Sequence, residues 1–200
     1  MYTYLYRLFL NILGMLNRGT VRSSIKFMKN EMESNGLVGA EVGVYLGRNS
    51  LMLLKNLDIK KLYLIDPYKN YKGKDGFSRN DFEIINKYAH KNLRKYNDRI
   101  VWIRDLSENA VKLIDDNSLD FVYIDGNHLY RWVKKDLELW YPKLKSDGFL
   151  CGHDFNRFDV ARAVVEFSNK IGANIECGGF PTDWWMKKII RLQKNKQIKN

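Results

Sequence analysis

Five short apolar runs in the chain each end at or beside an acidic side chain, and these carboxylates are the first candidates for chemistry. They are Glu41, Asp66, Asp105, Asp125 and Asp154. Short apolar runs that alternate with helical patterns are typical of parallel strands in α/β proteins. Because ligands of open α/β sheets bind beyond the carboxyl ends of the strands, we expect these five carboxylates to line one rim of a sheet.

The segment 41–50, EVGVYLGRNS, predicts a strand that turns into a helix beside a ligand. Gly43 and Gly47 let the backbone approach a ligand closely, and Asn49 or Ser50 is expected to cap the helix. The pattern G-x-G-x-x-G, which cradles a pyrophosphate at a helix N-terminus, is absent. This absence disfavours NAD and FAD, whereas S-adenosylmethionine has no phosphate and tolerates a looser loop.

The next two acidic positions suggest contacts to a nucleoside. Asp66 stands 23 residues after Gly43, at the end of the second predicted strand, and precedes Pro67. A carboxylate at this place accepts hydrogen bonds from both ribose hydroxyls in nucleoside-binding sheets, although a turn aspartate is the alternative. Asp105 and Leu106 are placed to hold an adenine, and a helix cap explains Asp105 nearly as well.

The segment 121–155 carries the densest set of reactive side chains. Asp125 and His128 are three residues apart on one loop, and Asp154 ends the neighbouring strand. Two carboxylates from adjacent strand ends suit Mg²⁺ or a similar hard cation, which lowers the pKa of a bound hydroxyl. His128 is the candidate general base, because an imidazole with a pKa of about 6.5 accepts protons near neutral pH. The alternative is that His128 and His153 only hydrogen-bond loop backbone.

The elements that must position these residues alternate along the chain as strands and helices. This pattern predicts an α/β fold of the Rossmann-like doubly wound type, with a mostly parallel seven-stranded sheet and a C-terminal antiparallel hairpin. The predicted strands are 37–42, 61–65, 100–103, 121–124, 149–152, 174–177 and 184–190. The predicted helices are 21–35, 49–57, 81–96, 107–114, 130–144 and 158–171. Thr20 is the predicted cap of the first helix and Gly36 its stop, Asp147 and Gly148 form a predicted turn, and Gly172 ends the last helix. We expect a helical extension over 1–35, the domain itself over 36–190 and a basic tail over 191–200.

Four motifs of the chain resemble those of small class I S-adenosylmethionine-dependent methyltransferases. They are EVGVYLG at 41–47, LIDPY at 64–68, YIDGNH at 123–128 and GFLCGHD at 148–154. The resemblance is to the family of sugar and macrolide O-methyltransferases that includes macrocin O-methyltransferase, and it spans residues 36–190. It implies that the chain methylates a hydroxyl of a sugar, a glycan or another small acceptor with S-adenosylmethionine as cofactor.

The resemblance also implies roles for individual residues. Asp125 and Asp154 would bind a divalent metal such as Mg²⁺, with His128 as the base and Asp125 beside it in catalysis. Metal-dependent relatives often carry an acidic or amide residue directly after the second metal ligand, where this chain has Phe155. The predicted cofactor-binding residues are Glu41, Gly43, Val44, Gly47, Ser50, Asp66, Pro67, Asp105, Leu106 and Asp125.

The formal net charge of +11 keeps other functions open. Such a charge attracts anionic partners, so the acceptor can be anionic and an RNA ribose methyltransferase is the first alternative. A non-catalytic interaction protein on a Rossmann scaffold is the second. An NAD-linked enzyme is the third, and the glycine pattern disfavours it.

The N-terminal segment 1–19 is apolar and aromatic but too short to span a bilayer, which takes about 20 apolar residues. It predicts an amphipathic helix that packs on the domain or on a second subunit of a homo-oligomer, and weak peripheral membrane contact is the alternative. It lacks the features of a secretory signal. The chain has two cysteines, too few for a disulfide scaffold, so we expect a cytoplasmic protein.

Overall fold

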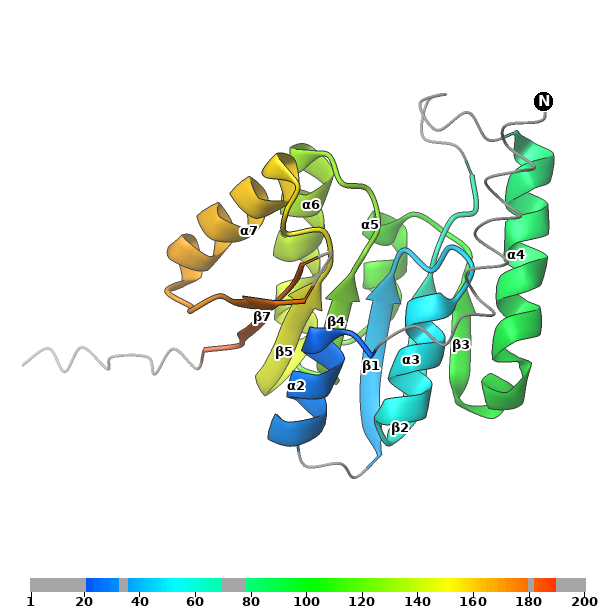
Figure 1. The fold of residues 1–200 in the computed structure, drawn as a ribbon, viewed down its shortest axis with the longest axis horizontal. Helices are drawn as coiled ribbons and strands as arrows, with labels where there is room; N and C mark the ends of the chain where they lie inside the picture. The colour runs from blue at the N-terminus through cyan, green and yellow to red at the C-terminus, as the bar shows by residue number, and fades with distance from the viewer. Residues whose placement is uncertain (1–20, 33–35, 70–77, 180–181, 190–200) are drawn as a thin grey trace, which may run out of the picture.

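The computed structural model describes residues 21–32, 36–69, 78–179 and 182–189, and these form one sheet with helices on both faces (Figure 1). The strand order is β3-β2-β1-β4-β5-β7-β6. The strands are β1 (Leu37–Val42), β2 (Ile59–Ile65), β3 (Ile100–Ile103), β4 (Leu119–Ile124), β5 (Leu144–Gly152), β6 (Glu176–Gly178) and β7 (Asp183–Lys187). The seven-stranded sheet confirms the predicted Rossmann-like fold.

The direction of the strands also agrees with the prediction. β1 pairs in parallel with β2 and β4, β2 with β3, and β4 with β5. β7 runs antiparallel to both β5 and β6, so the last two strands form the predicted antiparallel hairpin. The strand order reverses between β1 and β4, which places the switch point of the sheet between these two strands.

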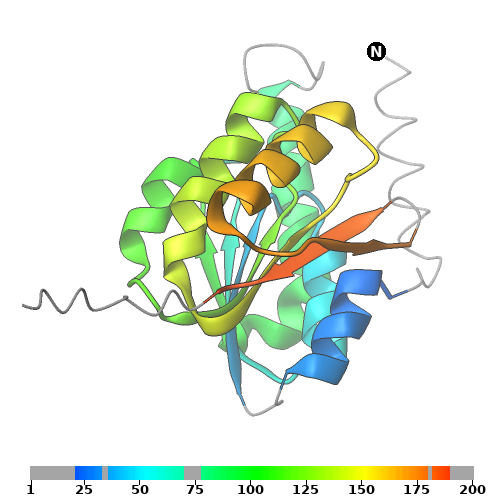
Figure 2. The same cartoon turned by 90° about the vertical axis from the view of Figure 1, so that its left-hand side faces the viewer.

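The sheet separates two hydrophobic cores, and described helices cover both of its faces (Figure 2). One face carries α2 (Ser23–Glu31), α3 (Arg48–Asn56) and α4 (Arg79–Leu93), and the other carries α5 (Ser107–Ala110), α6 (Tyr130–Trp140) and α7 (Phe158–Ile171). Their buried side chains include Ile25 on α2 and Trp140 on α6, which are both fully buried. This burial on both faces explains why the central strands read as continuous apolar runs.

Several bounds differ from the sequence prediction. β5 begins at Leu144, and the turn predicted at Asp147 and Gly148 lies inside it as an irregularity. Leu119 of β4 pairs with Leu144, whereas Phe121 pairs with Phe149, so the extra residues of β5 bulge out of the ladder. Helix α4 ends at Leu93 and continues as a 3₁₀ turn to Arg99.

Short 3₁₀ segments occur at two further places, Val111–Leu113 and Tyr141–Lys143. Helix α7 has the predicted bounds and ends at Gly172, whose φ of 78° is left-handed. Glycine adopts this conformation without the strain of a Cβ, so it stops the helix where the sequence predicts.

Helix α2 joins the domain core. Ile25 and Met28 are fully buried against the sheet. The predicted cap Thr20, the apolar segment 1–19, most of the basic loop 68–79 and the tail 191–200 lie outside the described residues. Among the helices that the structure does describe, none is long and apolar enough to cross a membrane.

Candidate active site

The loop after β1 passes directly against the end of β4, at the switch point of the sheet. The backbone N–H of Asp125 donates to the carbonyl of Val42 at 2.8 Å, and that of Gly43 donates to Ile65 at 2.9 Å. Gly43 has a φ of 91°, and a Cβ there would lie 2.3 Å from the carbonyl oxygen of Asp125. Only glycine fits this position, because both the conformation and the close approach exclude a side chain.

Glu41 lies inside β1 and is 1% exposed. Its carboxyl accepts hydrogen bonds from Asn49 Nδ2, at 3.1 Å, and from the Ser50 hydroxyl. The expectation that Asn49 or Ser50 caps α3 is wrong, because Gly47 is the residue before the helix and no side chain caps it. Their side chains serve Glu41 instead. Burial raises the pKa of Glu41 to about 8, despite these two donors.

Asp66 lies at the end of β2 and faces the loop after β1. Its Oδ2 accepts from the backbone N–H of Val44 at 3.0 Å and of Tyr45 at 2.9 Å, and its Oδ1 accepts from Tyr68 at 2.8 Å. Tyr45 and Tyr68 have φ angles of 50° and 44°, a left-handed conformation that is unusual for bulky residues. Asp66 therefore holds Tyr45 and Tyr68 in strained backbone conformations, and such strain is common near functional sites.

The remaining predicted cofactor contacts lie along the same rim. Pro67 follows Asp66 directly, and both are half-buried. Asp105 lies after β3, where its Oδ1 accepts from the backbone N–H of Leu106 at 2.6 Å and from Asn109 at 3.1 Å. Because neighbouring strands are about 4.8 Å apart, β3 lies roughly 14 Å from β4. The distance between Asp105 and Asp125 is therefore on the scale of a nucleoside, and the ends of β2 and β1 lie between these two residues.

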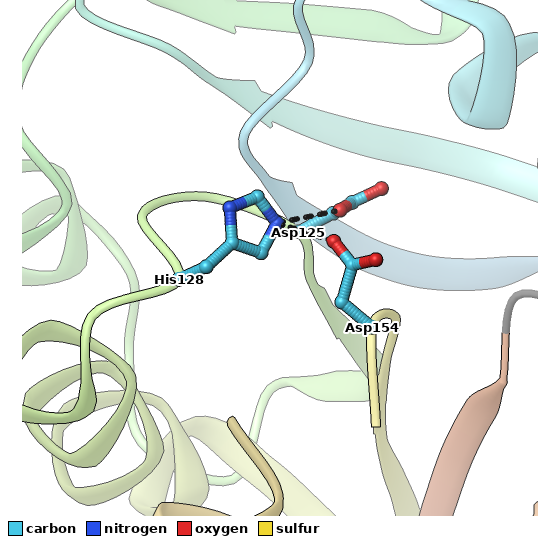
Figure 3. A group of neighbouring side chains, drawn as sticks. All are labelled: Asp125, His128 and Asp154. Carbon is cyan, nitrogen blue, oxygen red and sulfur yellow. Dashed lines mark ion pairs between the residues drawn. The ribbon is translucent and has the colours of Figure 1, made fainter. Parts of the chain in front are cut away.

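A second group of side chains gathers at the ends of β4 and β5 (Figure 3). His128 Nε2 lies 2.7 Å from Asp154 Oδ2 and 3.7 Å from Asp125 Oδ1. One ligand atom from each of the three residues lies within 4.8 Å of the other two. Asp154 has a φ of 59°, so a third strained residue lies at this rim. The structure thus brings together the three residues that the sequence proposed for catalysis and metal binding.

Comparison with known proteins places this geometry in a family. Residues 40–155, more than half of the chain, match a family model described as a methyltransferase domain. The chain belongs to this family. An uncharacterized protein of Acanthamoeba polyphaga mimivirus is 25% identical over 156 residues, which are 76% of this chain and 67% of that protein.

Solved structures share the fold of this methyltransferase domain. A putative caffeoyl-CoA O-methyltransferase from Staphylococcus aureus has a TM-score of 0.64 at 17% identity, over 93% of this chain and 91% of that one. A putative rRNA methylase from Clostridium thermocellum has a TM-score of 0.63 at 16% identity, over 83% of this chain and 95% of that one. These two neighbours carry names with different acceptors, so the shared fold alone does not select one.

The electrostatics of the methyltransferase domain concentrate opposite charges at the ends of β4 and β5. Burial alone lowers the pKa of His128, but the carboxylates of Asp125 and Asp154 outweigh it and raise the pKa to about 9. His128 and His153 hold the pKa of Asp154 well below its usual range. His128 is therefore a cation at neutral pH, unlike the mostly neutral imidazole that its unperturbed pKa suggested.

The donor atoms fit a divalent cation. His128 Nε2 is one of four buried side-chain nitrogen or oxygen atoms without a hydrogen-bond partner in the described part of the chain. Its short approach to Asp154 is a close ion pair that lacks hydrogen-bond geometry. An imidazole and two carboxylates with this spacing are ligands that divalent metals accept. The methyltransferase domain therefore offers a candidate cation site at Asp125, His128 and Asp154.

Sequence reasoning missed one residue of this region. Arg22 precedes α2, and its Nη1 donates to Asp125 Oδ2 at 2.9 Å and to the Tyr123 hydroxyl at 2.6 Å. Nothing in the local sequence marks Arg22, because it lies 103 residues from Asp125 along the chain. Only the packing of α2 against the sheet brings the two together.

Proposed function

We propose that this methyltransferase domain transfers the methyl group of S-adenosylmethionine to a hydroxyl of a sugar, a glycan or another small acceptor. The proposal depends mainly on one observation. Asp125, His128 and Asp154 lie together beside the loop after β1, which contains Gly43 and Gly47 (Figure 3). A cofactor held on that loop would present its methyl group toward these three side chains. Membership in the methyltransferase family supports methyl transfer as the reaction, and the side chains of the site support a hydroxyl group as the acceptor.

The loops after β1 and β2 are suited to a nucleoside without phosphates. Gly43 and Gly47 let the loop after β1 pack tightly, because a Cβ there would meet the Asp125 backbone or the Leu93 side chain, and Asp66 holds Val44 and Tyr45 in place. The hydrogen bonds that Asp66 accepts use part of the capacity of its oxygens, since a carboxylate has about four lone-pair sites. Because Val44, Tyr45 and Tyr68 already donate to Asp66, about one site remains. We propose that this site receives a ribose hydroxyl, with Pro67, Asp105 and Leu106 along the adenine side.

The chemistry needs little covalent help from the protein. A lone pair of the acceptor oxygen forms a bond to the methyl carbon while the carbon–sulfur bond breaks, and S-adenosylhomocysteine leaves. The hydroxyl proton must go to a base. His128 Nε2 is placed to take it when the imidazole is neutral and holds no cation, and water takes it when Nε2 holds a cation that lowers the pKa of the hydroxyl. The chain contributes mainly by holding the acceptor oxygen in line with the methyl group and by excluding water.

A divalent cation is part of the proposal. Asp125 Oδ1, Asp154 Oδ2 and His128 Nε2 would hold it, and when bound it would lower the pKa of an acceptor hydroxyl. The imidazole donor favours a transition ion such as Mn²⁺ over Mg²⁺, which prefers oxygen ligands. The chain keeps Asp154 in reach through the strained backbone at the end of β5.

The rim beside Asp154 suggests the type of acceptor. Arg157 is 57% exposed, with its Nε 3.6 Å from Asp154 Oδ2. Phe158 follows it with 78% exposure. We propose that Phe155, Asn156 and Arg157 contact the acceptor, and that Arg157 favours an anionic group on it.

Calorimetry with S-adenosylmethionine, S-adenosylhomocysteine and NAD⁺ tests the cofactor. We expect the first two to bind and NAD⁺ not to bind. If neither of the first two binds at millimolar concentration, the proposed function is wrong. Transfer of labelled methyl groups to a panel of sugars, glycans and RNA then identifies the acceptor class. Labelling of RNA alone, with steep salt dependence, would replace the small acceptor by a nucleic acid.

The substitution His128→Gln tests the acceptor side. We expect turnover to fall about 100-fold while the affinity for S-adenosylmethionine changes little, because a general base contributes on this scale. His90→Gln is the matched control, since His90 stacks on Trp102 at 3.8 Å beside α4 and β3. Equal turnover of H128Q and H90Q would return His128 to a structural role.

A further inference from the structure

Arg22 lies outside the part of the chain that matches the family model, yet its guanidinium reaches a carboxylate of the candidate active site. The match covers residues 40–155, and Arg22 stands before α2. Its Nη1 bonds Asp125 Oδ2 at 2.9 Å, and its side chain is only 26% exposed. A charge-assisted hydrogen bond of this kind is shorter and stronger than a neutral one, so it constrains the orientation of Asp125.

The two oxygens of Asp125 have different surroundings. Oδ2 accepts from Arg22, whereas Oδ1 faces His128 Nε2 at 3.7 Å and His153 Nδ1 at 3.9 Å. Rotation of the carboxylate would exchange these surroundings. Arg22 therefore selects the oxygen that points into the space shared with His128 and Asp154.

Buried hydrogen bonds anchor Arg22 in turn. Arg22 also donates to the hydroxyl of Tyr123, which donates to Asp183 Oδ1 at 3.2 Å. Asp183 Oδ2 accepts from the Ser24 hydroxyl at 2.6 Å and from the Ser24 backbone N–H at 3.1 Å. Tyr123, Asp183 and Ser24 are all at most 1% exposed. Such a satisfied buried network is rigid, because each member would lose its partner on moving.

This network joins three distant parts of the chain. Arg22 and Ser24 flank the start of α2, Tyr123 lies in β4, and Asp183 begins β7. Two of these elements, α2 and β7, lie outside the matched range 40–155. The network thus ties the first described helix and the last strand to the end of β4.

We propose that Arg22 is a positioning residue of the active site, which holds Asp125 Oδ2 so that Oδ1 faces a ligand shared with His128 and Asp154. The proposal rests on the proposed function for the identity of that ligand. It assigns α2 and β7 a role in the site in addition to their role in the core. Groups that orient metal ligands in this way typically change metal affinity 10-fold to 100-fold when they are removed.

The test compares full-length wild-type protein with Arg22→Gln and Arg22→Lys. Crystal structures report the orientation of Asp125, and electron paramagnetic resonance with Mn²⁺ alone reports affinity. We expect R22Q to turn the Asp125 carboxylate and to lower Mn²⁺ affinity at least 10-fold. R22K keeps the charge but has no planar fork, so we expect a smaller loss than in R22Q.

Arg99→Gln is the matched control, because Arg99 is also partly buried and bonds a carbonyl, that of Ile59 at 3.3 Å, at the opposite end of the sheet. R99Q should leave Mn²⁺ affinity unchanged. Should R22Q fail to fold, the orientation and affinity measured in R22K decide the question by the same criteria.

An unchanged Asp125 orientation, or an Mn²⁺ affinity equal to or higher than that of the wild type, would overturn the role of Arg22. A higher affinity would show that Arg22 competes with the cation. If the wild type binds S-adenosylmethionine but no Mn²⁺, the cation of the proposed function is wrong, and the Asp125 orientation in R22Q alone decides the role of Arg22.

Discussion

The loops after β1 and β2 use carboxyl groups differently from the loops after β4 and β5. In the first region, Glu41 and Asp66 are bonded by neutral donors of the protein, and burial raises the pKa of each. In the second, His128 faces Asp125 and Asp154, and the two histidines lower the pKa of Asp154. An acidic residue at a strand end is thus structural or reactive according to the partner that the fold gives it.

The comparison suggests a division of labour. The first region fixes the backbone around a cofactor, because its carboxyl groups serve N–H and hydroxyl donors of the loop itself. The second region holds opposite charges close together without full hydrogen bonding, and His128 Nε2 forms an ion pair with Asp154 but has no hydrogen-bond partner among the described residues. A buried polar atom without a partner is costly unless a ligand completes it.

The largest effect is expected where the two regions touch. Gly43→Ala places a Cβ 2.3 Å from the Asp125 carbonyl oxygen at a φ of 91°. Strain and overpacking together should lower the free energy of unfolding by about 3 kcal/mol or more. Gly172→Ala is the control, since Gly172 has a φ of 78° with nothing within 4 Å. G172A should lower the free energy of unfolding in urea by only about 1 kcal/mol. Equal losses in G43A and G172A would show that the backbone at Asp125 shifts easily to accommodate the new Cβ.

Paired substitutions test the division of labour directly. Asp154→Asn should weaken Mn²⁺ binding about 10-fold to 100-fold and leave S-adenosylmethionine binding nearly unchanged. Asp66→Asn should do the reverse, because its single amide oxygen can accept from Val44 and Tyr45 or from Tyr68 but not from all three. Calorimetry with each ligand measures both. Asp147→Asn, on the exposed bulge of β5, is the control and should change neither.

The first region also predicts a dependence of stability on pH. The folded pKa of Glu41 is about 8, above its unfolded value of 4.5, so the folded state holds a proton that the unfolded state releases. Stability from this group is present below pH 4.5 and falls as pH rises toward 8. Glu41→Gln should remove a decline on the order of 3 kcal/mol from unfolding curves measured between pH 5 and 8. If stability still declines with rising pH in E41Q, another titrating group causes the decline.

The smallest effect concerns the strained tyrosines. Tyr68 is buried, and its hydroxyl donates to the Tyr45 carbonyl at 3.1 Å. Tyr68→Phe should lower the free energy of unfolding by about 1 kcal/mol, because Asp66 still holds both backbones. Tyr141→Phe, which removes a bond from the Ile189 N–H at 3.2 Å outside both regions, is the comparison. A loss in Y68F well above that in Y141F would mean that Asp66 does not hold the loop alone.

Much of the fold could be predicted because periodicity reports burial directly. Strands between two helical layers must be apolar on both faces, so β1 and β4 were visible as runs, and Gly172 marked the end of α7. Bounds were wrong where the chain departs from regular pairing, as at the bulge of β5. The misassigned cap at Asn49 and Ser50 has the same origin, because a local pattern does not show that a buried carboxyl competes for the side chain.

The sequence by itself determined that Asp125, His128 and Asp154 share one rim, because adjacent parallel strands end on the same side of a sheet. Tertiary structure alone decided their charges, since a pKa depends on burial and on neighbours that are distant in sequence. It also decided that Arg22 reaches Asp125, because a contact between residues 103 positions apart arises from helix packing and leaves no pattern in the chain.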